Sequence, residues 1–354
     1  MINSHRLRLL ESILSHYQLD SLLIYSTNEK YKYSNWLFRV RPLLYNYIFI
    51  NKNGSYGFLE ISYLVANLAR VVGDVEIIEI NETNPTPGIQ KAIGQAKIVG
   101  LIGDVPYHHI RSLINDDYKF VDLNDSVAGL LWQKTDEEIF TLREGAQILS
   151  SIISQVNTYI QKDTTEEEIE RELKINIFSK AEGLAFPVSI TTDDDLLNST
   201  VKFPTTKVIK KGSSICIDMG LIYKGLYTDI TRMFFTTENN IKNEYDLLKQ
   251  VHYEIISTLR PGVKLENIKE MYIEKLNALG LNGDSLEFQD LGHSIGFDVH
   301  EAPFLVTEKY KDFELQENMV FTLEPEILTK SQHRIRIEDM IVCKKDSCEV
   351  LTVV

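Results

Sequence analysis

The first third of the chain alternates between the apolar spacing of helices and that of strands. A helical spacing over residues 7–14 leads into residues 19–26, whose apolar run predicts a buried strand. Residues 45–61 predict a β-hairpin, because Asn53-Gly54 between two apolar runs is a strong signal for a two-residue turn. Further short strand patterns alternate with helical stretches. This part of the sequence, residues 1–132, is therefore predicted to form one α/β domain.

From residue 133 onward, a pattern of two helices followed by strands occurs twice. The first two helices are predicted to begin at capping boxes, Thr135 with Glu138 and Thr165 with Glu168. Strand patterns follow, and they predict a hairpin that turns at Tyr223-Lys224-Gly225 and carries Asp218 and Asp229 on its two arms. A second pair of helices and three more strand segments come next. Periodicity alone predicts an α+β domain in which helices cover a sheet.

Composition and charge exclude several classes of protein. The chain of 354 residues has a formal net charge of −14, which argues against non-specific nucleic-acid binding. No apolar run approaches the ~20 residues that span a bilayer, and the N-terminus has no signal-peptide pattern. The three cysteines are scattered, which indicates reduced thiols. We therefore expect a cytoplasmic protein that acts on a small molecule or a small peptide, without nucleic-acid or membrane partners.

Five residues with metal-ligating side chains stand in strand-like segments of the C-terminal half: Asp218, Asp229, His293, Glu324 and Glu338. Four carboxylates and one imidazole form a hard ligand set that suits two divalent ions and does not suit a closed structural zinc site. Each residue alone is more often structural than metal-binding. Their joint occurrence in ICIDMG, YTDIT, LGHSIGFDVHEAP, VFTLEPE and RIRIEDM favours a metal centre.

These motifs, in the order Asp, Asp, His, Glu and Glu, resemble those of the metallopeptidase family that includes prolidase, aminopeptidase P and methionine aminopeptidase. Creatinase shares the fold of that family. The resemblance implies a creatinase-type N-terminal domain over residues 1–132. It also implies a pseudo-symmetric "pita-bread" domain with a dinuclear metal site over residues 133–354. The expected activity is hydrolysis of the amide bond before proline.

The resemblance also implies how the two ions are held. Asp218 would bind one ion, His293 and Glu324 the other, and Asp229 and Glu338 would bridge the pair. Two ions ~3.5–4 Å apart can share a water, lower its pKa and polarise the carbonyl that the water attacks. Mn²⁺ is the first choice for this site, with Co²⁺, Fe²⁺ and Zn²⁺ as alternatives.

Further residues match the family's substrate side. Glu324 would relay the proton of the attacking water, and His300 would bind the scissile carbonyl or the developing oxyanion. Arg336 would either orient Glu338 or pair with a substrate carboxylate. Thr231 lies two residues after an aspartate ligand and would hydrogen-bond a carboxylate or the water.

The sequence departs from the family pattern around the expected pocket. Peptidases of the family carry another histidine 17 residues before the first aspartate, where this chain has Val201. Gln289 stands at a position that is often histidine, while Ser294 and Glu326 replace glycines. Val201 and Gln289 are therefore candidate substrate-binding positions, and the pocket around the ligands is expected to differ from that of the known peptidases.

Three functions remain open at this point. The first is an Xaa-Pro dipeptidase or aminopeptidase with altered specificity, which the creatinase-type N-terminal domain favours. The second is a metal-dependent hydrolase or lyase of a small amide, cyclic amidine or modified amino acid, which Val201 favours. The third is a non-catalytic scaffold that binds a peptide or protein, and the complete ligand set weighs against it.

The family resemblance finally implies a homodimer in which the N-terminal domain of one subunit covers the site of the other. The candidate covering segment is the aromatic and basic stretch Tyr31, Tyr33, Trp36, Arg39 and Arg41. Ordinary surface and core packing is the alternative explanation for these residues.

Overall fold

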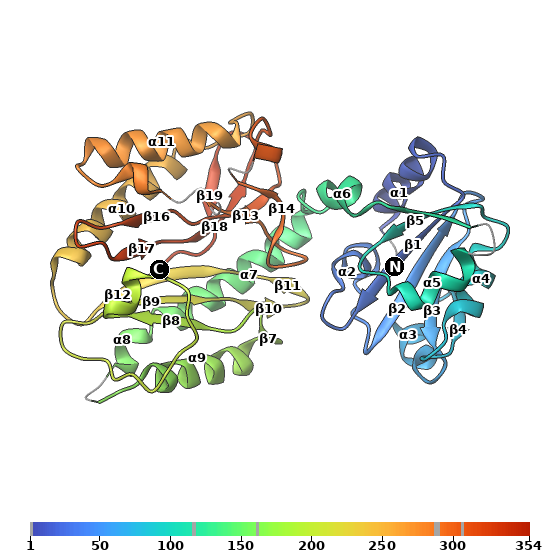
Figure 1. The fold of residues 1–354 in the computed structure, drawn as a ribbon, viewed down its shortest axis with the longest axis horizontal. Coiled ribbons are helices and arrows are strands. Elements are labelled where there is room, and N and C mark those ends of the chain that lie inside the picture. Colours follow the sequence, from blue (N-terminus) through green and yellow to red (C-terminus); the bar gives the residue numbers. More distant parts are fainter. Residues whose placement is uncertain (1–2, 115–117, 161–162, 287–290, 306–307) are drawn as a thin grey trace. The chain divides into compact units, whose positions relative to one another are not determined.

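The computed structural model describes residues 3–114, 118–160, 163–286, 291–305 and 308–354. The chain forms two compact units, Met1–Leu130 and Leu131–Val354 (Figure 1). No helix in the described part of the chain combines the length and the apolar character that crossing a bilayer requires.

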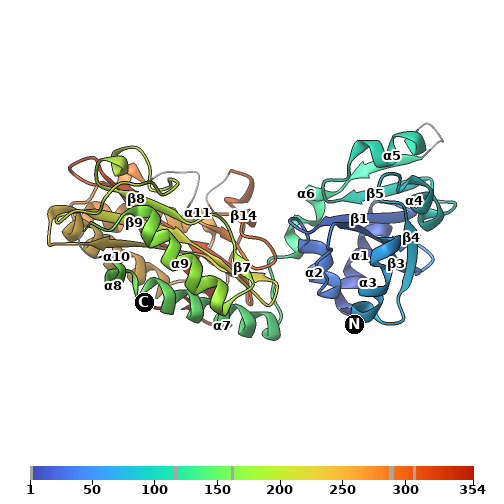
Figure 2. The ribbon, with the colours of Figure 1, turned by 90° about the horizontal axis from the view of Figure 1, so that it is seen from below.

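The N-terminal unit is an α/β layer structure around one six-stranded sheet, whose strand order is β4-β3-β2-β1-β5-β6. The strands are β1 (Ser21–Thr27), β2 (Tyr45–Asn51), β3 (Tyr56–Ile61), β4 (Glu76–Ile80), β5 (Ile98–Ile102) and β6 (Lys119–Asp122). The helices are α1 (Ser4–His16), α2 (Lys32–Phe38), α3 (Val65–Val72), α4 (Thr86–Ile93), α5 (Tyr107–Ile114) and α6 (Asn124–Val127). Helices cover both faces of the sheet (Figure 2).

Alternation along the strands explains the two covered faces. Tyr47 and Phe49 of β2 pack in one cluster with Ile89 of α4 and Ile110 of α5. The opposite face of the sheet carries Phe58 and contacts α2, since the ring centres of Phe38 and Phe58 lie 4.6 Å apart. Successive side chains of a strand point to opposite faces, so a sheet buried on both sides requires apolar residues at nearly every position.

The hairpin expected at residues 45–61 is present as β2 and β3, but its turn is longer than predicted. Ile50 pairs with Tyr56, and the loop between the strands contains Lys52 to Ser55 rather than the two residues Asn53-Gly54 alone. Gly54 adopts φ of 84°, and the Asn53 side chain accepts a hydrogen bond from the backbone N–H of Ser55. The Asn-Gly pair therefore supplies the turn chemistry within a four-residue loop.

The aromatic residues of the candidate covering segment belong to the core of the N-terminal unit. Tyr31, Tyr33 and Trp36 are almost fully buried, whereas Arg39 and Arg41 are exposed. The Arg41 guanidinium lies 5.0 Å from the ring centre of Tyr31. Packing thus accounts for the aromatic positions, and only the two arginines lie on the surface.

The C-terminal unit repeats helices followed by strands, as the periodicity predicts. Its first half contains α7 (Asp136–Ile153), α8 (Val156–Tyr159), α9 (Glu166–Lys180), β7 (Gly183–Leu184), β8 (Ser189–Thr192), β9 (Ser214–Met219), β10 (Leu221–Tyr223), β11 (Leu226–Tyr227) and β12 (Ile230–Phe235). Its second half contains α10 (Asn240–Ile256), α11 (Leu265–Ala278), β13 (His293–Ser294), β14 (Glu301–Phe304), β15 (Val320–Leu323), β16 (Glu326–Leu328), β17 (Arg334–Arg336), β18 (Asp339–Cys343) and β19 (Cys348–Val350).

Within this unit the strands lie between two pairs of helices (Figure 1). One apolar core packs α7 and α9 against β8, β9 and β12, and a second packs α10 and α11 against the strands of the other half. Both predicted capping boxes are confirmed at the starts of α7 and α9. The two outer helix pairs bury the sheets, so polar side chains on the inner strands need a specific partner.

Two antiparallel pairings matter for the site. β9 pairs with β12, and β15 pairs with β18 in the five-stranded sheet β14-β13-β15-β18-β19. An isolated bridge between Thr231 and Glu338 joins the two halves. The segments that carry the five candidate ligands are thereby brought to one place.

Candidate metal centre

Asp218 and Asp229 converge because they lie on two arms of one hairpin. The chain reverses at Lys224-Gly225, where both residues have positive φ values of 48° and 75°. Asp218 of β9 lies directly opposite Thr231 of β12, and Asp229 precedes Thr231 by two residues. Residues two apart on a strand share a face, so both carboxylates point to the same side of the hairpin.

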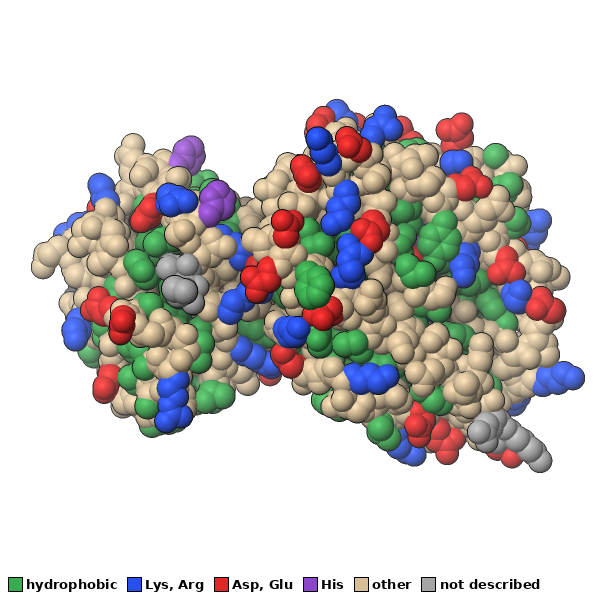
Figure 3. Space-filling view, turned by 180° about the vertical axis from the view of Figure 1, so that it is seen from behind, with side chains coloured by type: hydrophobic (Ala, Val, Ile, Leu, Met, Phe, Trp, Pro, Cys, Tyr) green, Lys and Arg blue, Asp and Glu red, His purple; other side chains and the backbone are tan. Residues whose placement is uncertain are grey.

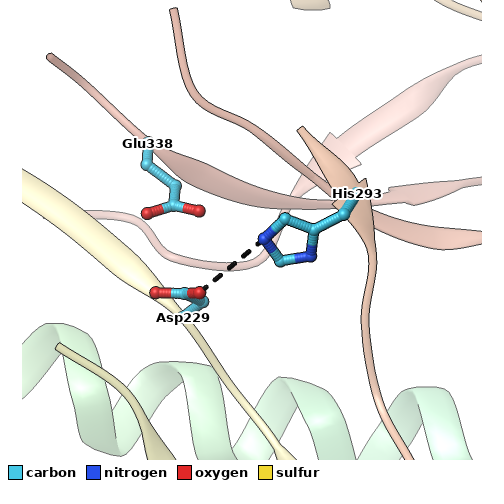
Figure 4. A group of neighbouring side chains, drawn as sticks. All are labelled: Asp229, His293 and Glu338. Atoms are coloured by element: carbon cyan, nitrogen blue, oxygen red, sulfur yellow. Dashed lines mark ion pairs between the residues drawn. The ribbon is translucent and has the colours of Figure 1, made fainter. Parts of the chain in front are cut away.

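The second half of the unit supplies the other three residues. His293 begins β13, Glu324 follows the last residue of β15, and Glu338 directly precedes β18. The His293 Nε2 atom lies 4.0 Å from Asp229 Oδ2 and 3.6 Å from Glu324 Oε1. Asp229, His293 and Glu338 offer ligand atoms that all lie within 4.8 Å of one another, and Figure 4 shows the three side chains pointing toward a common centre.

Burial and mutual repulsion make the site costly without a cation. Burial raises the pKa of Asp229 well above its usual value, and the charges of Glu338, Asp218 and Glu324 raise it further. Burial, and then Asp218, raise the pKa of Glu338 from 4.5 to about 8. Burial also lowers the pKa of His293 to about 3, which keeps the imidazole neutral and able to donate a lone pair.

Three buried oxygen atoms provide a direct test of whether these residues fit metal ions. Asp218 Oδ1, Asp229 Oδ1 and Glu338 Oε1 have no hydrogen-bond partner among the described residues. Buried carboxylate oxygens without partners are rare in folded proteins, and divalent cations satisfy them. Together with the neutral His293, these oxygens fit a divalent metal centre.

The metal-free protein is expected to lose stability as pH rises from about 6.5 to 8. Glu338, with its pKa raised to about 8, keeps in the folded chain a proton that the unfolded chain has released, so ionisation favours unfolding in this range. Burial lowers the pKa values of His109, His252 and His293, so these groups oppose the loss only near pH 6.5, where the unfolded imidazoles still release protons. Thermal unfolding in a chelator across this pH range measures the effect.

Saturation with Mn²⁺ is the matched condition for that measurement. The increase in melting temperature on adding Mn²⁺ should be larger at pH 8 than at pH 6.5, because the ions compensate the ionised carboxylates. A metal-free melting temperature that stays constant or rises over this range contradicts the prediction.

Around the cluster, Thr231 and Arg336 contact different ligands. The Thr231 hydroxyl donates a hydrogen bond to Glu338 Oε2 at 2.8 Å. Arg336 Nη1 lies 3.5 Å from Glu324 Oε2 and 3.9 Å from Asp218 Oδ2. Of the two residues, Thr231 is thus the one that holds the Glu338 side chain directly, while Arg336 faces the carboxylates of Glu324 and Asp218.

A buried polar network behind the cluster was not anticipated from the sequence. Arg232 donates hydrogen bonds to the backbone carbonyls of Thr231 and Glu338, and its Nη2 lies 2.5 Å from Asp339 Oδ1. The other Asp339 oxygen lies 3.1 Å from His252 Nε2. Burial alone would raise the pKa of Asp339, but Arg232 and His252 hold this pKa below its usual value. The available signal is a charged residue, Arg232, inside the largely apolar strand ITRMFF.

Replacing Arg232 by methionine is expected to destabilise the C-terminal unit by about 3–5 kcal/mol, because it leaves a buried carboxylate without its cation. Denaturant unfolding of the metal-free protein measures this change. Lys242→Met is the control, since Lys242 makes exposed ion pairs on α10 and its loss should have little effect. Equal unfolding midpoints for Arg232→Met and the control would contradict the structural role of Arg232.

His300 lies beside the cluster at the surface. Its ring centre is 4.5 Å from that of His293, and its side chain is exposed. The loop that carries it is anchored by Glu301, which accepts the backbone N–H groups of Phe297 and Asp298 and pairs with Lys134 Nζ at 2.7 Å. Both charged groups of this pair are fully buried. A buried ion pair with further hydrogen bonds fixes the loop and hence the place of His300.

The remaining candidates lie outside the cluster. Val201 belongs to an irregular segment beside β8, with 51% of its surface exposed. This segment is held near the site because the backbone N–H of Lys202 donates to Ser189 Oγ, and Ser189 pairs with Asp218. Gln289 lies outside the described residues.

Comparison with known proteins yields one family and several relatives. Residues 141–345 match the model of metallopeptidase family M24. An uncharacterized peptidase of Methanocaldococcus jannaschii is 29% identical over 245 residues, 68% of each chain. The Xaa-Pro dipeptidase of Pyrococcus horikoshii is 24% identical over 341 residues, covering 94% of this chain and 93% of that protein. A structure of Xaa-Pro dipeptidase from Bacillus anthracis superposes with a TM-score of 0.87 at 23% identity, over 99% of this chain and 97% of that one. The expected fold is therefore confirmed.

Proposed function

Because the chain belongs to metallopeptidase family M24 and is therefore a metallohydrolase, we propose that it hydrolyses the peptide bond before proline. The observation that carries the proposal is the convergence of Asp229, His293 and Glu338, with ligand atoms within 4.8 Å of one another. Similarity over nearly the whole chain to an Xaa-Pro dipeptidase supports the choice of substrate. This similarity extends over the N-terminal unit. An activity unrelated to proline would leave the similarity of that unit unexplained.

The five candidate ligands, Asp229 and Glu338 among them, would hold two divalent ions. When bound, such ions lower the pKa of a shared water and polarise the carbonyl group. Mn²⁺ is the proposed native metal, because carboxylate oxygens dominate the ligand set.

The protein's own residues then position the substrate and move the proton. Glu324, 3.6 Å from His293 Nε2, would accept the proton of the attacking water and pass it to the leaving nitrogen. His300 would donate a hydrogen bond to the carbonyl oxygen as negative charge develops there. Thr231 holds Glu338 through its 2.8 Å hydrogen bond, and so keeps a proposed metal ligand in one orientation.

The direct test is a panel of Xaa-Pro dipeptides, Xaa-Pro tripeptides and matched peptides with alanine in place of proline. The assay uses protein freed of metal and then loaded separately with Mn²⁺, Co²⁺ or Zn²⁺. Metal-dependent cleavage of the proline peptides alone is expected. Metal content of one ion or more per chain with no cleavage of any peptide would refute the proposed substrate.

A second candidate is hydrolysis of a small non-peptide amide or amidine at the same metal centre. The exposed apolar side chain of Val201, in place of the family's histidine, favours this reading. Small cyclic amides and amidines in the same assay separate it from the first candidate. The retained ligand cluster weighs against the third possibility, a non-catalytic scaffold that binds a peptide or protein.

We further propose a homodimer in the cytoplasm. Exposed apolar side chains of α9, Ile175 and Phe178, support self-association. On the face shown in Figure 3, acidic and basic side chains are interspersed, which does not favour a polyanionic partner. Sedimentation analysis of the purified chain tests the dimer, and a monomer at micromolar concentration contradicts it.

A further inference from the structure

Glu326 is the centre of a charged cluster beside the proposed metal site. It begins β16 and pairs directly with Arg336 of β17, while Arg334 lies two residues away on the same face of the hairpin. Only 10% of the Glu326 side chain is exposed. One carboxylate oxygen accepts Arg334 Nη1 at 2.9 Å, and the other lies 3.0 Å from both Nε and Nη2 of Arg336.

These contacts occupy the guanidinium of Arg336 on two sides. Its Nε and Nη2 atoms face Glu326, and its Nη1 atom faces Glu324 and Asp218 at 3.5 and 3.9 Å. A guanidinium binds a carboxylate best through two parallel N–H groups, and the Nε–Nη2 edge is the one already taken. Arg336 therefore has an internal counter-ion in the position where a substrate carboxylate would form a paired contact.

The same carboxylate connects the site to the segment of Val201. The Thr200 hydroxyl, on a residue that is 2% exposed, donates a hydrogen bond to Glu326 Oε2. Val201, one departure from the family pattern, thus directly follows the residue that is hydrogen-bonded to Glu326, another departure. A change at Glu326 therefore alters the surroundings both of Arg336 and of the segment that carries Val201.

On this geometry we propose that Glu326 is a specificity-determining residue that excludes a free carboxylate after proline, so the preferred substrates are Xaa-Pro peptides extended or amidated beyond proline. The inference rests on the proposed Xaa-Pro peptidase function and deepens it. A dipeptide carboxylate entering beside Arg336 would meet the negative charge of Glu326 and would have to displace the Glu326 oxygen that contacts both Nε and Nη2 of Arg336. An amide or a further peptide unit carries no such charge.

The test compares Leu-Pro with Leu-Pro-amide in Mn²⁺-loaded protein, by the release of leucine. The wild type should cleave the amide with a kcat/KM at least about tenfold higher than that of the free dipeptide, since a charge-assisted pair contributes about that much. Glu326→Gln keeps the shape and removes the charge. It should shift the ratio toward the free dipeptide by about tenfold, mainly through a lower KM, with the amide little changed.

Glu254→Gln is the matched control, because it removes one carboxylate from an exposed ion pair on α10 and should leave the ratio unchanged. A wild type that prefers the free dipeptide, or an unchanged ratio in Glu326→Gln, overturns the proposal while leaving the peptidase function intact. The wild-type comparison decides the matter even if the variant does not fold.

A binding measurement separates this proposal from the function on which it rests. If neither peptide is cleaved, the Xaa-Pro function fails, and titration calorimetry with proline and prolinamide still tests Glu326. Tighter binding of prolinamide to the wild type, with a gain in proline binding in Glu326→Gln, supports the exclusion of the carboxylate. Equal binding of both compounds, or binding of neither, overturns it.

Discussion

Replacing Asp229 by asparagine is expected to abolish metal-dependent hydrolysis while leaving the metal-free fold at least as stable as that of the wild type. Asp229 is a proposed metal ligand, and its loss would remove several kcal/mol of transition-state stabilisation, so activity should fall by at least ~10³-fold. Burial and three neighbouring carboxylates raise the pKa of Asp229, and ionised Asp229 therefore disfavours the metal-free fold at neutral pH. Asparagine removes that charge without leaving a cavity.

Three measurements on the Asp229→Asn variant check this expectation: bound metal by elemental analysis, the melting temperature with and without Mn²⁺, and peptide cleavage. The wild type should gain about 2.7 kcal/mol of stability when Mn²⁺ is at a hundred times its dissociation constant, and the variant should gain little. Asp246→Asn, an exposed position on α10, is the control and should behave as the wild type. Retained metal and activity in Asp229→Asn would mean that Asp229 is not a ligand.

The second large effect is expected from Val201→His. An imidazole at this position would supply one more hydrogen-bond donor for the developing oxyanion, and a single such donor is worth up to ~10²–10³-fold in turnover. Val201 is 51% exposed, so the larger ring can be accommodated without displacing core side chains. Steady-state kinetics with an Xaa-Pro tripeptide should show the increase in kcat rather than in KM.

Phe203→His places an imidazole two residues farther along the same exposed segment and serves as the control. It should leave turnover unchanged. A decrease in turnover, or no change, in Val201→His would indicate a pocket built for another substrate and would favour the non-peptide hydrolase. That outcome bears on the substrate alone, because the metal ligands are unchanged in this variant.

Much of the fold followed from local pattern in the sequence. The two capping boxes predicted helix starts that the structure confirms, since a capping box depends on residues only three positions apart. The hairpin that carries Asp218 and Asp229 was also predicted, because a strand pattern interrupted at Lys224-Gly225 defines it locally. The length of the loop after Asn51 was not predicted correctly, since the residues flanking a turn also decide how many residues it contains.

The partners of Arg336 and Arg232 could not be predicted in this way. The sequence left open whether Arg336 orients Glu338 or binds a substrate, whereas the structure shows its contacts with Glu326, Glu324 and Asp218. Arg232 was not recognised at all, although it holds Asp339 and two backbone carbonyls behind the cluster. Most of these contacts join strands that are distant in sequence. The pairing of Glu326 with Arg336 within one hairpin also depends on register, since a shift by one residue would exchange the partners.

By itself, the sequence determined which side chains are available as metal ligands and on which local elements they lie, because residue type and strand alternation are local properties. Only the tertiary structure decided that Asp229, His293 and Glu338 meet within 4.8 Å. It alone decided, too, that Glu326 takes up the guanidinium edge of Arg336. The physical reason is that electrostatic interactions depend on distance and burial across strands, and both quantities are fixed by packing and pairing register rather than by position along the chain.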